Sequence, residues 1–287
     1  MINALTFDVE EYFHAEVFAG VVRPEDWATL ESRVVDPTER LLDLLDEASS
    51  RATFFVLGWV AERQPRLVQA IAARGHEVAC HGYGHQMITR LNRAQFGEDV
   101  RRAKAVVEDA AGSEVIGYRA PTFSVVRETL WSLEVLVENG FQYDSSIFPI
   151  VHDRYGIPNA PRFPSRMAAG PGMAITEFPL STVAGLRWRF PVGGGGYFRL
   201  SPYAVTGWAV RHLNTRERQP AMVYLHPWEI DAGQPKLPVG RSAQFRHSVN
   251  TGSRTVMKLR RLLRDFRFAP VRDVLAGSGI MTSGRAA

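Results

Sequence analysis

Acidic residues and histidines follow two apolar runs of this sequence, and their types are those of a hydrolytic metal site. Asp8 and Glu10 come directly after a short apolar run near the N-terminus, and His81 and His85 come after a second one. Two imidazoles and a carboxylate form one of the ligand sets of catalytic zinc, which leaves coordination positions open for water. The sequence therefore predicts a metal-assisted hydrolytic centre.

The spacing of these residues indicates how they are presented. Along an extended strand residues i and i+2 share a face, so Asp8 and Glu10 point together and Glu11 points away. One acid can bind a metal ion while the other accepts a proton from water. Gly82 and Gly84 between the two histidines favour a loop over a helix. A pair of hydrogen-bonded loop histidines without a metal is the structural alternative.

Two further polar residues stand at the ends of apolar runs. Arg119 follows the run 115–118, and its guanidinium would keep Asp8 ionised if the two side chains met. His226 follows the run 221–225, and its pKa near neutrality suits protonation of a leaving group. A structural ion pair is the alternative for Arg119, and a core histidine is the alternative for His226.

Strand and helix patterns alternate along most of the chain, which predicts a mostly parallel sheet covered by helices. Because the polar residues come where the strands stop, they would gather at the C-terminal ends of the strands, as in a βα barrel or a relative of one. Strands are expected at 4–7, 52–58, 77–80, 115–118, 141–143, 174–180 and 221–226. Helices are expected at 36–49, 65–75, 92–112, 128–140, 202–214 and within the basic segment 253–272.

The length of 287 residues and the 45% hydrophobic content fit one globular domain. We expect this domain to span 1–275, with a long insertion rich in proline and glycine at about 149–200 and a flexible tail at 276–287. The lone cysteine, Cys80, excludes an internal disulfide and is expected to be buried.

The composition also limits the partners and the location. The net charge of +4 is concentrated in 253–272, but no nucleic-acid-binding module accompanies it, so no nucleic-acid partner is expected. No stretch of about 18 apolar residues exists, which argues against a membrane span. The N-terminal residues lack the basic and apolar parts of a signal peptide, so we expect a cytoplasmic protein.

Several segments, taken in order, resemble the polysaccharide deacetylase (NodB-homology) family. They are Phe7-Asp8-Val9-Glu10, His81-Gly-Tyr-Gly-His85, Arg119-Ala-Pro and Leu225-His226-Pro. The longer segments FDVEEYFH, YRAPTFSV, YDSSIFP, GGGYFRLSPY and YLHPWEID are similar to deacetylases of bacterial exopolysaccharide loci, including those linked to exosortase systems. The resemblance implies a distorted (β/α) barrel of about seven parallel strands.

The resemblance also implies the reaction, which is removal of an N-acetyl group from an amino sugar of a bacterial exopolysaccharide or its precursor. A divalent metal ion, zinc or else cobalt, would be held by Glu10, His81 and His85. Asp8 would be the base, Arg119 its ionic partner and His226 the acid. The glycan is the expected partner, near membrane-bound synthesis machinery. Further contacts are assigned to the backbone N–H near Thr122 just past Pro121, to Asp144 as orienter of His226, and to Tyr143, Leu225 and Trp228 as the acetyl pocket.

The sequence departs from the family's motif at one position, and two other functions stay open. The common motif has two adjacent aspartates, whereas Val9 separates Asp8 from Glu10 here, so Glu11 is an alternative ligand. The second function is hydrolysis of a small amide or ureide, with or without a metal. The third is glycan binding by a decayed site, which the presence of Asp8, Arg119 and His226 disfavours.

Overall fold

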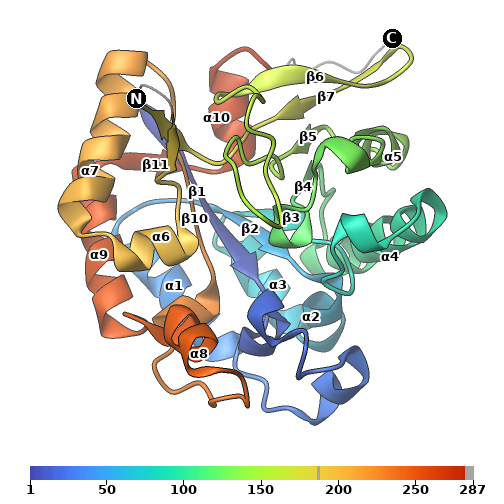
Figure 1. Ribbon diagram of the computed structural model, residues 1–287, viewed down its shortest axis with the longest axis vertical. Coiled ribbons are helices and arrows are strands. Elements are labelled where there is room, and N and C mark those ends of the chain that lie inside the picture. The colour runs from blue at the N-terminus through green and yellow to red at the C-terminus, as the bar shows by residue number, and fades with distance from the viewer. Residues whose placement is uncertain (186–187, 282–287) are drawn as a thin grey trace.

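The computed structural model describes residues 1–185 and 188–281, which fold around a mostly parallel β-sheet (Figure 1). In this part of the chain seven strands run parallel in the order β10-β1-β2-β3-β4-β5-β7, β11 pairs parallel with the start of β1, and β6 pairs antiparallel with β7. The expected α/β barrel of about seven parallel strands is thereby confirmed. The strands are β1 Ile2–Val9, β2 Thr53–Val56, β3 Glu77–Cys80, β4 Gly117–Tyr118, β5 Tyr143–Asp144, β6 Ser165–Gly170, β7 Met173–Glu177, β8 Thr182–Ala184, β9 Arg189–Pro191, β10 Met222–Leu225 and β11 Arg267–Ala269.

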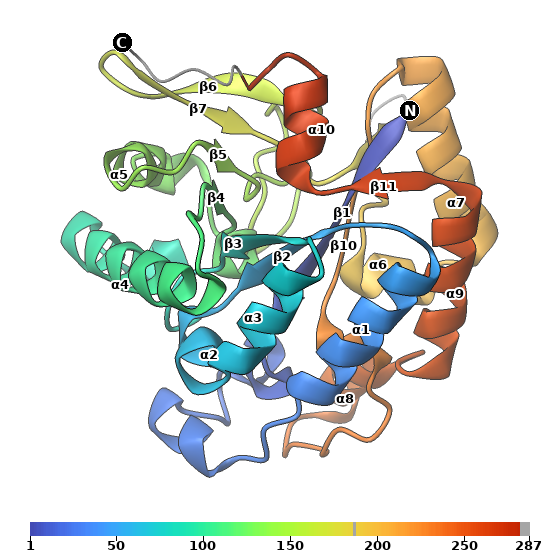
Figure 2. The same cartoon turned by 180° about the vertical axis from the view of Figure 1, so that it is seen from behind.

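Helices connect the strands and cover the outer face of the sheet, as the view from behind shows (Figure 2). Helix α4 begins at a capping box in which Asn92 and Gln95 bond each other's backbone N–H, and it ends at Gly112 in the left-handed conformation. The helices are α1 Val35–Glu47, α2 Gly58–Arg63, α3 Pro65–Ala73, α4 Arg93–Ala111, α5 Ser132–Glu138, α6 Gly195–Leu200, α7 Tyr203–His212, α8 Arg241–Ser248, α9 Ser253–Asp265 and α10 Val271–Gly277.

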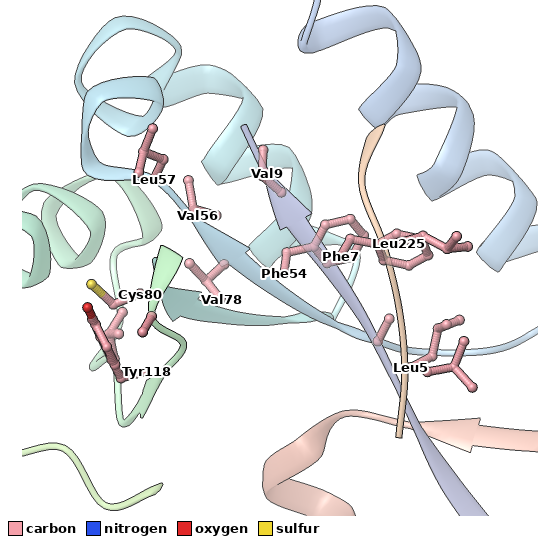
Figure 3. Packing of buried hydrophobic residues seen from close by; sticks show 14 of the residues in the cluster. Leu5, Phe7, Val9, Phe54, Val56, Leu57, Val78, Cys80, Tyr118 and Leu225 are labelled. Carbon is pink, nitrogen blue, oxygen red and sulfur yellow. The ribbon is translucent and has the colours of Figure 1, made fainter. Parts of the chain in front are cut away.

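Side chains of β1 alternate between two buried environments. Leu5, Phe7 and Val9 belong to the main hydrophobic core between the sheet and the helices, where Phe7 stacks on Phe54 at 5.0 Å (Figure 3). Asp8 has the opposite parity and faces the barrel interior. The apolar residues of β1 therefore fix its orientation, and that orientation presents the intervening polar residues to the interior.

An irregular segment closes the gap between the two ends of the parallel sheet. Ser181 accepts a hydrogen bond from Val192 N and its hydroxyl accepts one from Met222 N on β10. Gly193 O accepts a hydrogen bond from Tyr224 N, also on β10. The barrel is therefore closed by loop contacts instead of a continuous strand, which explains why it is distorted.

Several predicted elements differ from the observed ones. The segment 149–200 contains β6, β7, β8 and β9 as well as α6, and β7 belongs to the barrel sheet. Gly58 starts helix α2 instead of ending a strand. The basic segment 253–272 holds α9, β11 and the start of α10, and α10 extends to Gly277, inside the expected tail. Residues 282–287 of that tail lie outside the described residues.

Two expectations about burial can be compared with the structure. Cys80 is fully buried, and burial raises the pKa of its thiol to about 12, so it is unreactive, as predicted. Among the described residues, none of the helices has both the length and the apolar character that crossing a membrane requires.

Candidate active site

Three side chains from the ends of β1 and β3 converge at the C-terminal end of the sheet. Oε2 of Glu10 lies 2.7 Å from Nε2 of His85 and 3.8 Å from Nε2 of His81. Each residue offers one ligand atom, and these three atoms all lie within 4.8 Å of one another. The sequence predicted this set, and the fold brings it together although Glu10 and the histidines are more than 70 residues apart.

The protonation states of these side chains suit a cation. Nδ1 of His81 lies 2.8 Å from the carbonyl oxygen of Arg119, to which it donates, so Nε2 keeps its lone pair. Burial lowers the pKa of His81 to about 4, which keeps the ring neutral. Burial opposes ionisation of Glu10, but His85, His226 and His81 together hold the pKa of that carboxyl well below its usual range.

The donor set fits a divalent metal ion. Trp228 Nε1 donates to Oε1 of Glu10 at 3.1 Å, whereas the buried Oε2 receives no hydrogen bond of normal geometry. A buried carboxylate oxygen without a donor, facing two imidazole nitrogens, is the arrangement that a cation completes. The carboxylate of Glu11, the alternative ligand, is not part of this donor set; it accepts hydrogen bonds from Ser32 and from Arg33 N.

The loop that carries both histidines is held by a carboxylate from α4. Asp99 accepts hydrogen bonds from Tyr83 N at 2.9 Å and from Gly84 N at 3.2 Å. Gly82 has φ +74° and His85 has φ +48°, so the backbone turns twice through the left-handed region. Asp99 therefore stabilises a loop conformation that is unfavourable for His85 by itself.

Asp8 and Arg119 form a fully buried ion pair beside the three ligands. Nη1 of Arg119 donates to Oδ1 of Asp8 at 2.6 Å and to Thr6 Oγ1 at 2.8 Å. The remaining donors of Arg119 reach the backbone carbonyl oxygen and the hydroxyl of Ser145. The predicted pairing is present, and it leaves Oδ2 of Asp8 on the side of His226, 3.9 Å from Nε2.

His226 is oriented by a carboxylate that the sequence did not predict. Nδ1 of His226 donates to Oε1 of Glu229 at 2.8 Å, and Glu229 is in turn bonded by Arg199 at 2.6 Å. Burial lowers the pKa of His226, but Glu229 and the neighbouring Glu10 and Asp8 outweigh it and raise this pKa to about 9. Because Nδ1 is bonded to Glu229, the other ring nitrogen, Nε2, faces the metal ligands and lies 3.8 Å from Oε1 of Glu10.

The residues predicted to contact the substrate fall into two groups, one beside the metal ligands and one buried elsewhere in the barrel. Thr122 and Trp228 line a cavity of about 310 Å³ next to the ligands. Thr122 has φ +55°, and such strain in a non-glycine residue is concentrated at functional sites. Trp228 stacks on His226 at 4.7 Å. Pro121 lies next to Gly82 of the histidine loop.

Tyr143, Asp144 and Leu225 are not in this group, which corrects the sequence prediction. Tyr143 is fully buried in the barrel, and its hydroxyl donates to Glu77 at 3.0 Å. Leu225 faces the helices, within the main hydrophobic core (Figure 3). Asp144 accepts a hydrogen bond from Ser146, so its proposed contact with His226 is made by Glu229 instead.

Asp144 and Glu177 form a separate buried carboxyl pair that predicts a stability effect. They are register partners on β5 and β7, and Asp144 Oδ2 and Glu177 Oε2 are both buried without a donor. Burial raises the pKa of Asp144 to about 6, and burial together with charge repulsion from Asp144 raises the pKa of Glu177 well above its usual value. One proton shared between the two carboxyl groups explains why neither buried oxygen has another donor.

Because the folded pair holds a proton that the unfolded chain releases above about pH 4, its stability contribution falls as the pH rises. We expect Glu177→Gln, whose amide can donate to Asp144, to lose less thermal stability than the parent between about pH 5 and about pH 8. Thermal unfolding at both pH values measures this. Glu98→Gln on the surface is the control, and equal pH dependence in all three proteins would contradict the shared proton.

Three functional residues were missed by sequence reasoning, and one of them had a usable signal. Glu229 stands three residues after His226 at the start of a 3-10 turn, which is the spacing of a capping box, and its carboxylate also accepts from His226 N. Asp99 and Arg199 had no such signal, because each acts on a segment far away in the sequence.

Comparison with known proteins gives two matched segments. Residues 23–143 match the model of the family described as polysaccharide deacetylase. Residues 145–276 match a family described as a domain of unknown function, DUF3473. The first segment contains the two histidines and Arg119, and the second contains His226, Glu229 and Arg199.

Curated relatives match only part of the chain. The match to a peptidoglycan deacetylase-like protein of Gibberella zeae is 33% identical over 110 residues, and it covers 38% of this chain and 32% of that protein. The match to a peptidoglycan-N-acetylglucosamine deacetylase of Bacillus cereus is 30% identical over 98 residues, and it covers 34% and 36% respectively. The chain thus spans about a third of the length of these relatives.

Solved structures match over nearly the whole chain. A Mycobacterium smegmatis protein assigned to the polysaccharide deacetylases superposes with a TM-score of 0.62 at 24% identity, covering 99% of this chain and 93% of that one. A Pseudomonas aeruginosa protein assigned to the same class gives a TM-score of 0.62 at 14% identity, covering 97% and 92%. These similarities show a shared fold.

Proposed function

The chain carries a polysaccharide deacetylase domain of the NodB-homology type, and from this premise we propose that it hydrolyses N-acetyl groups of amino sugars in a glycan. The observation that carries the proposal is that two pairs of side chains adjoin one cluster of candidate metal ligands. Asp8 with its partner Arg119, and His226 with its partner Glu229, both adjoin the cluster of Glu10 and the two histidines. This combination of base, acid and cation site is sufficient for metal-assisted hydrolysis of an amide.

The proposed substrate is an N-acetylated glycan of a bacterial exopolysaccharide or its precursor. Relatives named as deacetylases of peptidoglycan and of chitooligosaccharides support an N-acetylated glycan as substrate. The segments FDVEEYFH and YLHPWEID favour a bacterial exopolysaccharide or its precursor. A location beside membrane-bound synthesis machinery stays a prediction, which co-purification with that machinery would test.

Glu10, His81 and His85 would hold a divalent metal ion, with zinc as the first choice and cobalt as the second. Such an ion, when bound, supplies Lewis acidity to the acetamide carbonyl and makes a nearby water more acidic. Trp228 holds the second oxygen of Glu10 and keeps it from turning away.

The protein groups supply the proton transfers. Oδ2 of Asp8 accepts a proton from the attacking water, while Arg119 binds Oδ1 and orients the carboxylate. The backbone N–H of Thr122 stabilises the oxyanion, since the N–H groups of Phe123 and Ser124 already donate within this strained turn. His226 gives the proton at Nε2 to the amine nitrogen as the C–N bond breaks, so acetate and the amino sugar leave.

The direct test is deacetylation of N-acetylglucosamine oligomers by the purified protein with added zinc or cobalt. We expect release of acetate and the loss of one acetyl mass per event, measured by mass spectrometry. Removal of the metal with a chelator should stop the reaction, and adding it back should restore it. Turnover that persists equally in chelator would overturn the metal-dependent mechanism.

Changing Glu229 to Gln should lower kcat without loss of metal. The amide keeps the shape but removes the charge that holds His226 in place, so we expect a fall of about 10- to 100-fold, less than the whole 10²–10⁴-fold contribution of a general acid. Arg199 keeps its backbone acceptors in 246–249, which limits the structural damage. An unchanged kcat at full metal content would show that Glu229 has no role in the reaction.

Changing Asp99 to Ala should weaken metal binding from a distance. The loop of 82–85 loses both acceptors that hold it, so we expect the metal affinity to fall by about 10- to 100-fold. Titration of the metal-free protein with zinc measures this affinity. Asp99→Asn keeps one acceptor oxygen and should be less impaired. Identical affinities for the parent and both variants would contradict the role of Asp99.

A further inference from the structure

Two arginines from different segments of the chain line the same cleft beside the candidate active site. Arg154 lies in the segment between β5 and β6, and Arg246 lies on α8, which Figure 1 shows near the C-terminal ends of β1 and β10. Both arginines line the cavity of about 310 Å³ that contains Thr122 and Trp228. The cleft therefore reaches the acid and the metal ligands through Trp228.

The same two arginines also line a second cavity. This cavity measures about 850 Å³ and extends towards Arg90 and Met87. Glu16 and Val17 line both cavities as well, so the two cavities adjoin each other, and together they are called the cleft here. An extended cleft that begins at the catalytic residues is suited to a chain of sugars more than to a single small amide.

The cleft keeps an excess of positive charge. Within residues 1–185 and 188–281, neither Arg154 nor Arg246 has a carboxylate oxygen within 4.0 Å of its guanidinium. Among the other charged groups, Glu16 is paired with Arg90 at 2.5 Å and Arg199 with the buried Glu229 at 2.6 Å. Asp153 contacts only His152, at 2.9 Å, and burial lowers the pKa of that imidazole, so the ring is neutral and the Asp153 carboxylate keeps its charge. The two arginines outnumber this one carboxylate. Two guanidinium groups therefore remain available to an anion.

Packing anchors the backbone beside each of the two exposed arginines. Next to Arg154, Tyr155 stacks on His152 at 3.8 Å and contacts the ring of Phe123, the residue after Thr122, at 6.0 Å. Next to Arg246, His247 stacks on Trp228 at 4.4 Å. Each guanidinium thus extends from a backbone anchored to a residue of the active site, as a specificity subsite requires.

We propose that this cleft binds an anionic group, a carboxylate or a phosphate, on a sugar next to the one that is deacetylated. The proposal rests on the proposed function, and it narrows the substrate class to acidic glycans. Arginine binds both groups through paired N–H donors, and two arginines in one cleft would fix the register of the glycan. Both lie within 145–276, outside the segment that matches the deacetylase family.

The test compares three N-acetylated oligosaccharides of equal length. One is neutral and contains only N-acetylglucosamine, one alternates N-acetylglucosamine with glucuronic acid, and one is the neutral chain with a phosphate ester. We expect kcat/KM to be about tenfold or more higher for at least one acidic substrate. The preferred one identifies the anion as carboxylate or phosphate, and the preference should shrink as salt is added.

Arginine variants connect this preference to the cleft. The double variant Arg154→Gln/Arg246→Gln should lose the preference through a higher KM while it deacetylates the neutral substrate as before. Arg241→Gln is the control for charge on α8, because it removes one arginine from that helix outside the cleft, as Arg246→Gln does inside it. Equal kcat/KM for all three substrates, or equal effects of the double and control variants, would overturn the proposal.

Failure of this inference can be told apart from failure of the proposed function. Deacetylation of the neutral substrate alone supports the function and refutes the acidic subsite. If no substrate is deacetylated, calorimetric binding of the two acidic oligosaccharides to the parent and to the double variant decides the inference separately. Tighter binding by the parent supports the subsite, and equal binding refutes it.

Discussion

Replacing Asp8 by Asn is expected to lower kcat by about 10²–10⁴-fold, the usual contribution of a general base. The amide cannot accept the proton of water, while Glu10 and the two histidines stay in place. Metal content should therefore remain that of the parent protein. The measurement is kcat on N-acetylglucosamine oligomers together with zinc content; parent-like kcat would exclude Asp8 as the base.

The same substitution should also destabilise the fold. Arg119 is fully buried, and without Asp8 its charge has no counter-ion, which costs about 3–5 kcal/mol when one partner of a buried pair is removed. Thermal or denaturant unfolding of the metal-free protein measures this loss.

A double variant separates the chemical effect from the structural one. Asp8→Asn/Arg119→Met removes both charges and should recover part of the stability, because no unpaired buried charge remains. Its activity should stay as low as that of Asp8→Asn. Recovery of both stability and activity would show that Asp8 acts only as a structural partner.

Replacing His81 by Ala is expected to remove both the bound metal and the activity. Changes to residues that only support the ligands lower metal affinity by about 10- to 100-fold. Because His81→Ala removes one of the three protein ligands themselves, we expect a larger fall in the affinity for zinc. Elemental analysis after dialysis and the deacetylation assay give the two readouts.

A remote histidine provides the matched control for this variant. His212 lies on α7 and contacts Glu217 instead of the metal ligands, so His212→Ala should keep metal and activity. Far-UV circular dichroism should show that the fold of His81→Ala is retained. A His81→Ala protein that still binds zinc as the parent does would exclude the proposed ligand set.

Local rules predicted much of the candidate site. The two-residue period of a strand placed Asp8 and Glu10 on one face, and glycine freedom placed the two histidines on a loop. The same period could have excluded Leu225, because it directly precedes His226 on the strand and so faces the opposite side. That error came from reading nearness in sequence as nearness in space.

Contacts between distant segments could not be predicted in this way. The position of Asp144 depends on the pairing of β5 with β7, and that pairing places it against Glu177, with His226 held by Glu229 instead. Asp99 holds the histidine loop from α4, and Arg199 reaches Glu229 across 30 residues of sequence. Such contacts depend on the register of strands and the packing of helices, which single-residue patterns do not encode.

The sequence by itself determined which side chains are available and which face of its own strand each one occupies, since both follow from residue type and backbone period. Only the tertiary structure decided which of them meet. Burial then set their charges, because the same low-dielectric interior keeps His81 neutral and binds Arg119 to Asp8. Identity and alternation are local properties, whereas partners, desolvation and cleft shape arise only when strands far apart in the sequence pack together.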